Sequence, residues 1–278
     1  MNYRRYIRTF KNWPYVFFNV FRKKFNFSVV YRDGRKVVAL TQAHLYFLSF
    51  DPKDLQYDEI NDVLSFDFEG RLVRMKGALN NGDVGSIFGQ LCYDVNVIGK
   101  TVVDIGANIG DSSIFFALKG ASRIIAIEPA YVNYLILKEN ISLNDLDSTI
   151  VPVNKGVSAE NGIIKLSPHS SGAMFKTLKN EPPDGIDVQL ISMKEVINDY
   201  NPQIIKIDCE GCEYNIFDNI SIDYLQKIEI ILGEYHHKGF YAINEKLQSA
   251  GFVTNFDQRK STGLFVALKK NISIDSKI

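Results

Sequence analysis

The chain has 278 residues, of which 46% are hydrophobic and 23% are charged, and this globular composition excludes an intrinsically disordered protein. There are 32 basic residues (lysine and arginine) and 32 acidic residues (aspartate and glutamate), so the formal net charge is zero. The balance disfavours a protein whose main task is to bind nucleic-acid phosphates, because such proteins carry a basic excess. We therefore predict no nucleic-acid partner.

Cysteines are few, and three of them do not make a disulfide framework. Cys209 and Cys212 share one Cys-Glu-Gly-Cys stretch, and Cys92 stands alone. We expect free thiols that fill small core positions, which suits a cytoplasmic location. No stretch approaches the ~20 consecutive apolar residues of a transmembrane helix, and no signal peptide is recognised.

Residues 1–27 are basic and aromatic. Seven of them are lysine or arginine, the first acid of the chain is Asp33, and aromatic residues recur every three or four positions from Tyr3 to Phe21. This period predicts a helix that is broken near Pro14. Packing of the aromatic stripe on the domain is the favoured interpretation. Peripheral contact with an anionic membrane through residues 1–27 is the alternative.

Residues 28–78 are predicted to form strands and turns. Asp33-Gly34 and Glu69-Gly70 are the expected turns of two hairpins. His44 lies in a mostly apolar stretch and is interpreted as a packing histidine. We assign residues 1–78 to an N-terminal extension, residues 79–272 to the main domain and residues 273–278 to a tail.

From residue 100 the pattern alternates between strands and helices. Strands are expected at 101–105, 123–127, 149–153, 187–191, 203–207, 227–232, 253–256 and 264–269. Helices are expected at 111–119, 131–144, 193–200, from about 212, and at 244–250. This alternation predicts a doubly wound α/β fold with a mostly parallel sheet, in which the closing hairpin gives one antiparallel strand.

The most informative stretch is the loop after the first of these strands. It reads Val102-Val103-Asp104-Ile105-Gly106-Ala107-Asn108-Ile109-Gly110-Asp111. Ligands of doubly wound sheets bind beyond the carboxyl ends of the strands, where glycines allow the backbone to approach closely. The two flanking carboxylates, Asp104 and Asp111, would repel a pyrophosphate but suit a cationic amino-acid group. The Gly-x-x-x-Gly spacing also differs from the Gly-x-Gly-x-x-Gly of dinucleotide-binding folds.

The next strand ends in Ile127-Glu128-Pro129, and Glu128 follows Asp104 by 24 residues. A carboxylate at this place accepts hydrogen bonds from the ribose hydroxyls of an adenosine. Together, the loop and Glu128 fit a nucleoside with a positively charged amino-acid tail. S-adenosylmethionine is such a molecule.

Three blocks carry a family resemblance. They are Val102–Asp111 with Phe116-Ala117 and Gly120-Ala121, then Ala126–Pro129 with Leu137–Asn140 and Asn144, and finally Ile205–Tyr214 with Gly233–His236. In order and spacing they resemble the FkbM-like family of class I S-adenosylmethionine-dependent methyltransferases, over about residues 80–270. The family's third block usually has apolar or small residues at the positions of Cys209 and Cys212.

The resemblance implies a Rossmann-like, seven-stranded sheet with an antiparallel last strand. It also implies that Asp104, Gly106, Asn108 and Gly110 line the methionine end of the cofactor, next to Asp111, and that Glu128 binds its ribose. The strand end near Val153 should border the adenine, with Asn154 as a candidate contact.

An acidic block follows the strand at 203–207. Asp208, Glu210, Glu234 and His236 all lie at or just past predicted carboxyl ends of strands, where they could position an acceptor and remove its proton. Their alternative role is to cap helices or to orient neighbouring groups. Glu213 and His237 are interpreted as supporting or solvated residues.

We predict no metal site. The alternatives are a divalent cation held by Asp208 and Glu210, or a zinc or redox site at Cys209 and Cys212.

These expectations define an S-adenosylmethionine-dependent methyltransferase that acts on a hydroxyl group of a sugar, glycolipid or other small metabolite. The hydroxyl acceptor is implied by the resemblance alone. Residues 235–241 and the hairpin region 161–176, with His169 and Met174, are expected near the acceptor. The alternatives are a non-catalytic or membrane-associated binding protein, a nucleic-acid methyltransferase and a nicotinamide dehydrogenase.

Overall fold

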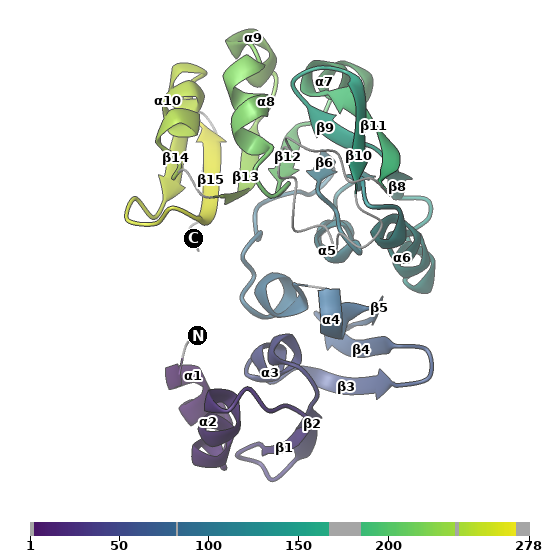
Figure 1. The fold of residues 1–278 in the computed structure, drawn as a ribbon, viewed down its shortest axis with the longest axis vertical. Coiled ribbons are helices and arrows are strands. Elements are labelled where there is room, and N and C mark those ends of the chain that lie inside the picture. The colour runs from purple at the N-terminus through teal and green to yellow at the C-terminus, as the bar shows by residue number, and fades with distance from the viewer. Residues whose placement is uncertain (1–2, 82, 167–184, 237–238, 271–278) are drawn as a thin grey trace. The chain divides into compact units, whose positions relative to one another are not determined.

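The computed structural model describes residues 3–81, 83–166, 185–236 and 239–270 (Figure 1). The contacts of the chain divide it into two compact units, Met1–Cys92 and Tyr93–Ile278. The predicted extension of residues 1–78 lies within the first unit, and the predicted tail of residues 273–278 lies outside the described residues.

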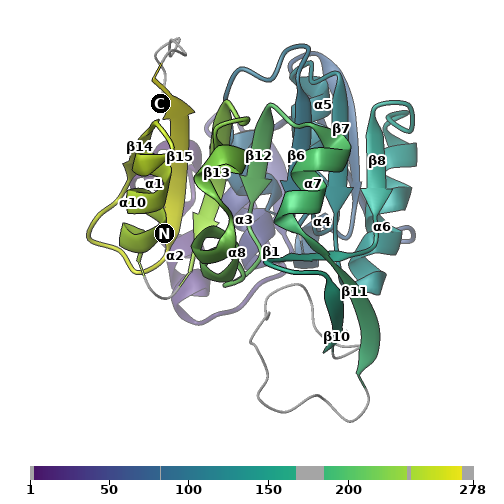
Figure 2. The ribbon, with the colours of Figure 1, turned by 90° about the horizontal axis from the view of Figure 1, so that it is seen from above.

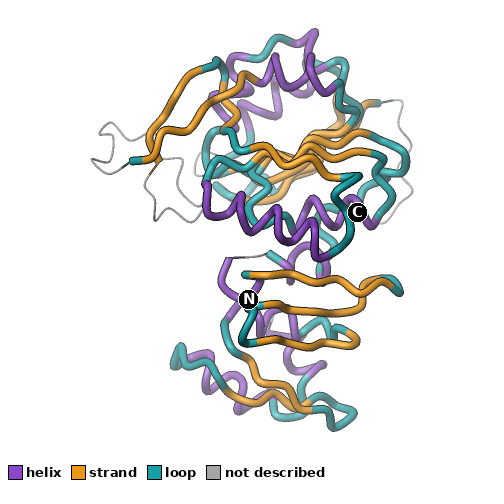
Figure 3. The backbone as a smooth tube through the Cα atoms, turned by 90° about the vertical axis from the view of Figure 1, so that its right-hand side faces the viewer, coloured by secondary structure: helices purple, strands orange, loops and turns teal. Residues whose placement is uncertain are grey.

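The N-terminal unit combines short helices with two small antiparallel sheets, whose strands are orange in Figure 3. Its helices are α1 (Tyr3–Thr9), α2 (Trp13–Phe21), α3 (Gln42–Leu48) and α4 (Ala78–Asn81), followed by a π-helical turn, η1 (Gly85–Gly89). One sheet pairs β1 (Phe27–Val30) with β2 (Lys36–Ala39), and the other has the order β3 (Lys53–Asp58), β4 (Val63–Phe68), β5 (Arg71–Lys76). Both predicted hairpins are therefore present.

The core of this unit contains part of the aromatic stripe of residues 1–27. Tyr6, Phe10 and Val16 are buried and pack with residues of β1 and α3. The break between α1 and α2 precedes Pro14, which lies in the first turn of α2, where its missing N–H is no loss. Among the described residues, no helix is long and apolar enough to cross a membrane.

The C-terminal unit alternates strands with helices. Its strands are β6 (Thr101–Ile105), β7 (Arg123–Ile127), β8 (Ile150–Val153), β9 (Gly156–Ser158), β10 (Gly162–Leu166), β11 (Ile186–Ser192), β12 (Ile204–Ile207), β13 (Ile230–Tyr235), β14 (Phe252–Phe256) and β15 (Gly263–Lys269). Its helices are α5 (Asp111–Leu118), α6 (Tyr131–Leu143), α7 (Met193–Tyr200), α8 (Glu213–Asn219), α9 (Ile222–Leu225) and α10 (Tyr241–Ser249).

Seven of these strands form one sheet in the order β14-β15-β13-β12-β6-β7-β8, and they lie side by side in Figure 2. β6, β7, β8, β12 and β13 pair in parallel, whereas β15 runs antiparallel to both of its neighbours. Helices α5 and α6 cover one face of the sheet, and α7, α8 and α10 cover the other (Figure 1). The predicted doubly wound α/β fold, seven-stranded with an antiparallel last strand, is confirmed.

One strand expected from the sequence lies elsewhere. β11 does not join the main sheet but pairs antiparallel with β10 and parallel with β9 in a separate sheet of three strands. Only Val188 and Ile191 of its seven residues are buried, which explains this place because a central strand of a parallel sheet is buried on both faces. By contrast, all four residues of β12 are buried.

Candidate functional site

The predicted site residues come together at the carboxyl ends of four adjacent strands. β13, β12, β6 and β7 are neighbours in the sheet and run parallel, so the loops that follow them emerge at the same edge. The ends of these strands and the segments that follow them carry all the predicted catalytic residues and all the predicted cofactor residues except Asn154, which follows β8.

Asp104 is fully buried, and it holds three parts of the fold together. Its Oδ2 atom accepts hydrogen bonds from the hydroxyls of Ser112 and Ser113 in the first turn of α5, each at 2.6 Å. Its Oδ1 atom lies 3.0 Å from the Nζ atom of Lys206, on the neighbouring strand β12. Asp104 thus ties β6 to α5 and to β12, and direct contact with a cofactor stays a prediction.

Lys206 was not identified from the sequence. This buried lysine also donates a hydrogen bond to the carbonyl oxygen of Gly106 at 2.9 Å. Burial disfavours its charged form, but the carboxylates of Asp104, Asp208 and Asp111 outweigh this effect and raise the pKa of Lys206. The signal that could have found it is a lone lysine within an otherwise apolar strand, because a charge there requires a buried partner.

The two glycines of the loop allow other parts of the protein to pack closely against it. Gly106 has φ of +75°, and a Cβ atom on it would lie 1.9 Å from the carbonyl oxygen of Asp208. Gly110 has φ of +93°, and a Cβ atom there would lie 2.6 Å from the Cδ1 atom of Leu137 on α6. The loop after β6 is therefore packed closely against β12 and α6. Asp111, in the first turn of α5, is buried.

Glu128 is buried at the end of β7. One carboxylate oxygen accepts the backbone N–H of Asn108 and the other accepts that of Ala130, both at 2.8 Å. Burial raises the pKa of Glu128 to about 7, although these hydrogen bonds oppose the rise. The side-chain amide of Asn154 donates to the carbonyl oxygens of Glu128 and Pro129, at 2.8 Å and 3.1 Å. Asn154 thus fixes the end of β7, and its contact with an adenine stays a prediction.

The loop after β12 contains a disulfide, which contradicts the expectation of free thiols. Cys209 and Cys212 are bonded, with their Cα atoms 5.5 Å apart. The intervening Glu210 and Gly211 both have positive φ, at 55° and 112°, and this tight turn brings the two cysteines together. Cys92 is not part of this disulfide. The thiol argument for a cytoplasmic location is therefore removed.

His236 collects the carboxylates of the site around one imidazole. Its Nδ1 atom lies 2.9 Å from Oε1 of Glu213, which is fully buried on α8. Its Nε2 atom lies 3.8 Å from Asp208 and 3.6 Å from both Glu210 and Glu234. The structure therefore brings together all four predicted catalytic residues and adds Glu213 as the group that orients the imidazole.

The charges decide the state of this imidazole. Burial disfavours the charged form of His236, but the hydrogen bond to Glu213 and the charges of Glu213, Glu210 and Asp208 outweigh it and raise the pKa to about 9. His236 is then an imidazolium near pH 7 and is not available to accept a proton. Asp208 is the better candidate base, and Oδ2 of Asp208 receives a long hydrogen bond of 3.5 Å from the hydroxyl of Tyr93.

A cation other than a proton also fits this cluster. Ligand atoms of Asp208, Glu234 and His236 lie within 4.8 Å of one another and could hold a metal ion. The expectation that the site has no metal therefore stays a prediction. His169, Met174 and His237, which were expected near the acceptor or in support, lie outside the described residues.

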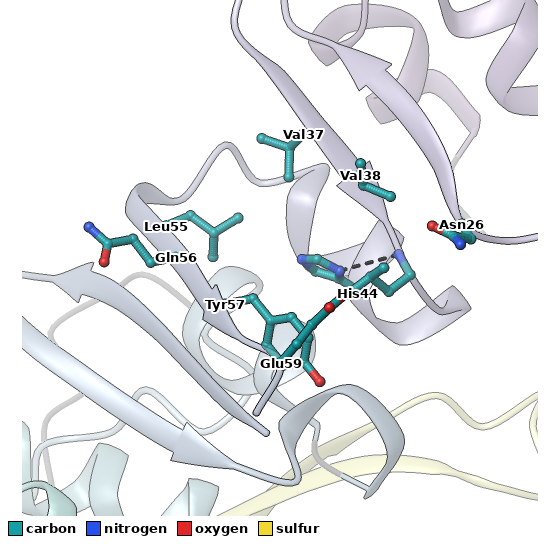
Figure 4. Close-up of a pocket in the computed structure, with 9 residues that line it drawn as sticks. Asn26, Val37, Val38, His44, Leu55, Gln56, Tyr57 and Glu59 are labelled. Atoms are coloured by element: carbon teal, nitrogen blue, oxygen red, sulfur yellow. Dashed lines mark hydrogen bonds between the residues drawn. The ribbon is translucent and has the colours of Figure 1, made fainter. Parts of the chain in front are cut away.

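The N-terminal unit has a separate cavity of about 270 Å³, shown in Figure 4. Val37, Val38 and Leu55 contribute apolar side chains to it, and the buried His44 lies beside them. Burial lowers the pKa of His44 to about 4, so its imidazole is neutral. Its Nδ1 atom accepts a long hydrogen bond of 3.4 Å from the backbone N–H of Leu40. His44 is thus buried in packing, as predicted, and burial is the cause of its pKa shift, whereas acids raise the pKa of His236.

Comparisons with known proteins agree with the fold. A family model described as the methyltransferase FkbM domain matches residues 104–254, which is more than half of the chain. The methyltransferase sdnD of Sordaria araneosa is 25% identical over 185 residues, covering 53% of this chain and 71% of that protein. The predicted family resemblance is confirmed.

Solved structures are similar at a lower level. Methyltransferase FkbM from Methylobacillus flagellatus KT is 17% identical, with a TM-score of 0.45. That match covers 61% of this chain, which spans only 43% of the Methylobacillus protein. The B. subtilis M1A22 tRNA methyltransferase TrmK is 18% identical, with a TM-score of 0.40, covering 65% of this chain and 64% of that one.

Proposed function

This chain belongs to the methyltransferase FkbM domain family, and we propose that it transfers the methyl group of S-adenosylmethionine to a hydroxyl of a sugar, glycolipid or other small metabolite. One observation carries the proposal. Glu128, a buried side chain placed to bind a ribose, lies at the same edge of the sheet as the carboxylates around His236.

The residues after β6 and β7 suit the cofactor. Each oxygen of Glu128 accepts one backbone N–H, which leaves each oxygen a lone pair for a ribose hydroxyl. The first turn of α5 offers backbone N–H groups to the carboxylate of the amino-acid tail, and Asp111 lies beside them. The cofactor would supply an activated methyl group on a sulfonium centre.

Asp104 and Lys206 stabilise the loop that would bind the cofactor. Their ion pair of 3.0 Å neutralises both buried charges, and Lys206 holds the carbonyl of Gly106 in place. Both residues are therefore assigned a positioning role. The net negative charge at this edge then comes from Asp111 and the acids around His236, and it favours a cationic sulfonium.

The residues after β12 and β13 would act on the acceptor. When the acceptor's hydroxyl oxygen takes the methyl group, the sulfur of the cofactor would keep the electrons of its bond to that group, and Asp208 would accept the hydroxyl proton. The imidazolium of His236, fixed by Glu213, lies 3.8 Å from Asp208 and can hold its carboxylate in place. Glu210 and Glu234 are left to contact the hydroxyl-rich acceptor.

Calorimetry with S-adenosylhomocysteine tests the cofactor without an acceptor. We compare the wild type with Glu128→Ala and with the control Glu160→Ala, which changes an exposed glutamate in the same unit. Loss of the ribose contact should weaken binding by about 1–3 kcal/mol, or about 5- to 150-fold, and the control should bind as the wild type does. Failure of the folded wild type to bind would refute the proposal.

Methyl transfer itself is tested with radiolabelled S-adenosylmethionine and separate pools of sugars, glycolipids and transfer RNA. Label in the sugar or glycolipid pool, lost in Asp208→Asn, is the expected result. Label in RNA alone would refute the hydroxyl-bearing small acceptor and leave the cofactor assignment intact.

A further inference from the structure

Helix α2 exposes aromatic side chains, of which the ring of Tyr15 also contacts the core residue Phe27 at 5.9 Å between ring centres. On α2, Tyr15, Phe18 and Phe21 are 51%, 55% and 91% exposed. They are spaced three residues apart, which places them on one face of the helix. The opposite face carries Val16 and Asn19, which are buried. The aromatic stripe of residues 1–27 is therefore only partly buried, because Tyr6 and Phe10 are buried and Phe21 is exposed.

Basic residues lie at the C-terminal end of this exposed face. Arg22, Lys23 and Lys24 follow α2 directly and are exposed, and the guanidinium of Arg22 lies 4.7 Å from the centre of the Phe18 ring. Residues 1–32 contain no aspartate or glutamate. Large exposed aromatic groups within a field of a single charge sign indicate a binding surface, because solvation alone does not favour them.

We propose that the exposed face of α2, with the basic residues that follow it, docks on an anionic lipid bilayer. Aromatic rings of this kind partition into the boundary between lipid headgroups and acyl chains. Lysine and arginine beside them bind the anionic headgroups. α2 has nine residues and is about 13 Å long, so it would lie in the plane of the interface.

The charge pattern favours a bilayer over a protein partner. The buried centre of a protein interface is depleted in charged residues, lysine in particular. Here the lysines directly follow the most exposed aromatic residue, Phe21, and their positive charge is complementary to a surface rich in anionic lipid.

The test is sedimentation of the full chain with two kinds of vesicle, one of phosphatidylcholine alone and one with 30% phosphatidylserine. We expect binding only to the anionic vesicles and a weakening by salt. Arg22→Gln/Lys23→Gln/Lys24→Gln should lower the partition coefficient about 100-fold. Phe18→Ser/Phe21→Ser should lower it at least about 10-fold without changing the charge.

Two matched controls address general surface effects. Ile60→Ser removes an apolar residue that is 95% exposed, at the turn between β3 and β4. Lys36→Gln/Lys53→Gln/Arg71→Gln removes three exposed charges elsewhere in the same unit. Both should bind vesicles as the wild type does, which separates this surface from the whole unit.

Several outcomes would overturn the proposal. They are equal binding to both kinds of vesicle, equal losses in the controls, or no binding by a folded wild type. A chain that stays off vesicles but self-associates in sedimentation velocity, and becomes monomeric in Phe18→Ser/Phe21→Ser, would assign the surface to a second copy instead.

Discussion

Gly106 is the most constrained point of the proposed site, and its replacement by alanine tests the packing directly. The missing Cβ atom would lie 1.9 Å from the carbonyl oxygen of Asp208 and 2.9 Å from its carbonyl carbon. Both are backbone atoms, so no side-chain rotation can relieve the clash. The backbone N–H of Asp208 also donates to the carbonyl oxygen of Ile105 at 3.0 Å. This hydrogen bond holds the loop after β12 against the end of β6.

The expected magnitude has two parts. A positive φ costs an L-residue roughly 1–2 kcal/mol. Forcing a methyl group into packed backbone adds roughly 1–3 kcal/mol. Gly120 is the matched control in the same unit, because its φ is +95° but its added Cβ atom would lie 3.5 Å from Ile98, an ordinary contact. Gly120→Ala should therefore lose only the first part.

Urea denaturation followed by circular dichroism gives the comparison. We expect Gly106→Ala to lose roughly 2–5 kcal/mol of unfolding free energy and Gly120→Ala roughly 1–2 kcal/mol. Binding of S-adenosylhomocysteine should also weaken in Gly106→Ala and stay unchanged in Gly120→Ala. If the two variants were equally stable and bound S-adenosylhomocysteine equally well, the close approach of Gly106 to the backbone of Asp208 would be wrong.

Three further predictions follow from the charges. The pKa of His236 is raised from 6.5 to about 9, so its contribution of roughly 3 kcal/mol to stability is complete below pH 6.5 and is lost as the pH rises through 9. Urea denaturation should show this loss in the wild type and not in His236→Asn. Lys206→Met leaves the buried Asp104 unpaired and should cost about 3–5 kcal/mol. The control Lys100→Met, at a partly exposed ion pair, should cost less than about 1 kcal/mol in the same assay. Asp208→Asn should lower kcat at least about 100-fold with unchanged affinity for S-adenosylhomocysteine by calorimetry, and normal turnover would exclude Asp208 as the base.

Much of the main sheet was predictable because its strands are short apolar runs between clear turns. β6, β7 and β12 lie within one residue of the predicted strands. β11 was harder to place, since a strand pattern does not specify which sheet the strand joins. Its partner β10 ends at Leu166 and β11 begins at Ile186, and pairing between strands so far apart in the sequence depends on the tertiary fold.

The sequence predicted where the site residues lie in the fold but not which side chains contact one another. Strand ends locate Asp208 and His236 at one edge, but the sequence alone does not reveal that Glu213 reaches back from α8 to the imidazole. Nor does it reveal the disulfide, which depends on the positive φ of Glu210. The charge state of His236 results from these neighbours, and it favours Asp208 over His236 as the candidate base.

The contacts between β6 and β12 join the two halves of the proposed site. Asp104 and Gly106 belong to the cofactor side, and Lys206 and Asp208 belong to the acceptor side. The ion pair, the bond from Lys206 to the Gly106 carbonyl and the close approach of Gly106 to Asp208 all connect these sides. A rigid connection of this kind fixes the distance between methyl donor and base, which is what an in-line transfer requires. A change of acceptor should therefore leave these contacts between β6 and β12 in place.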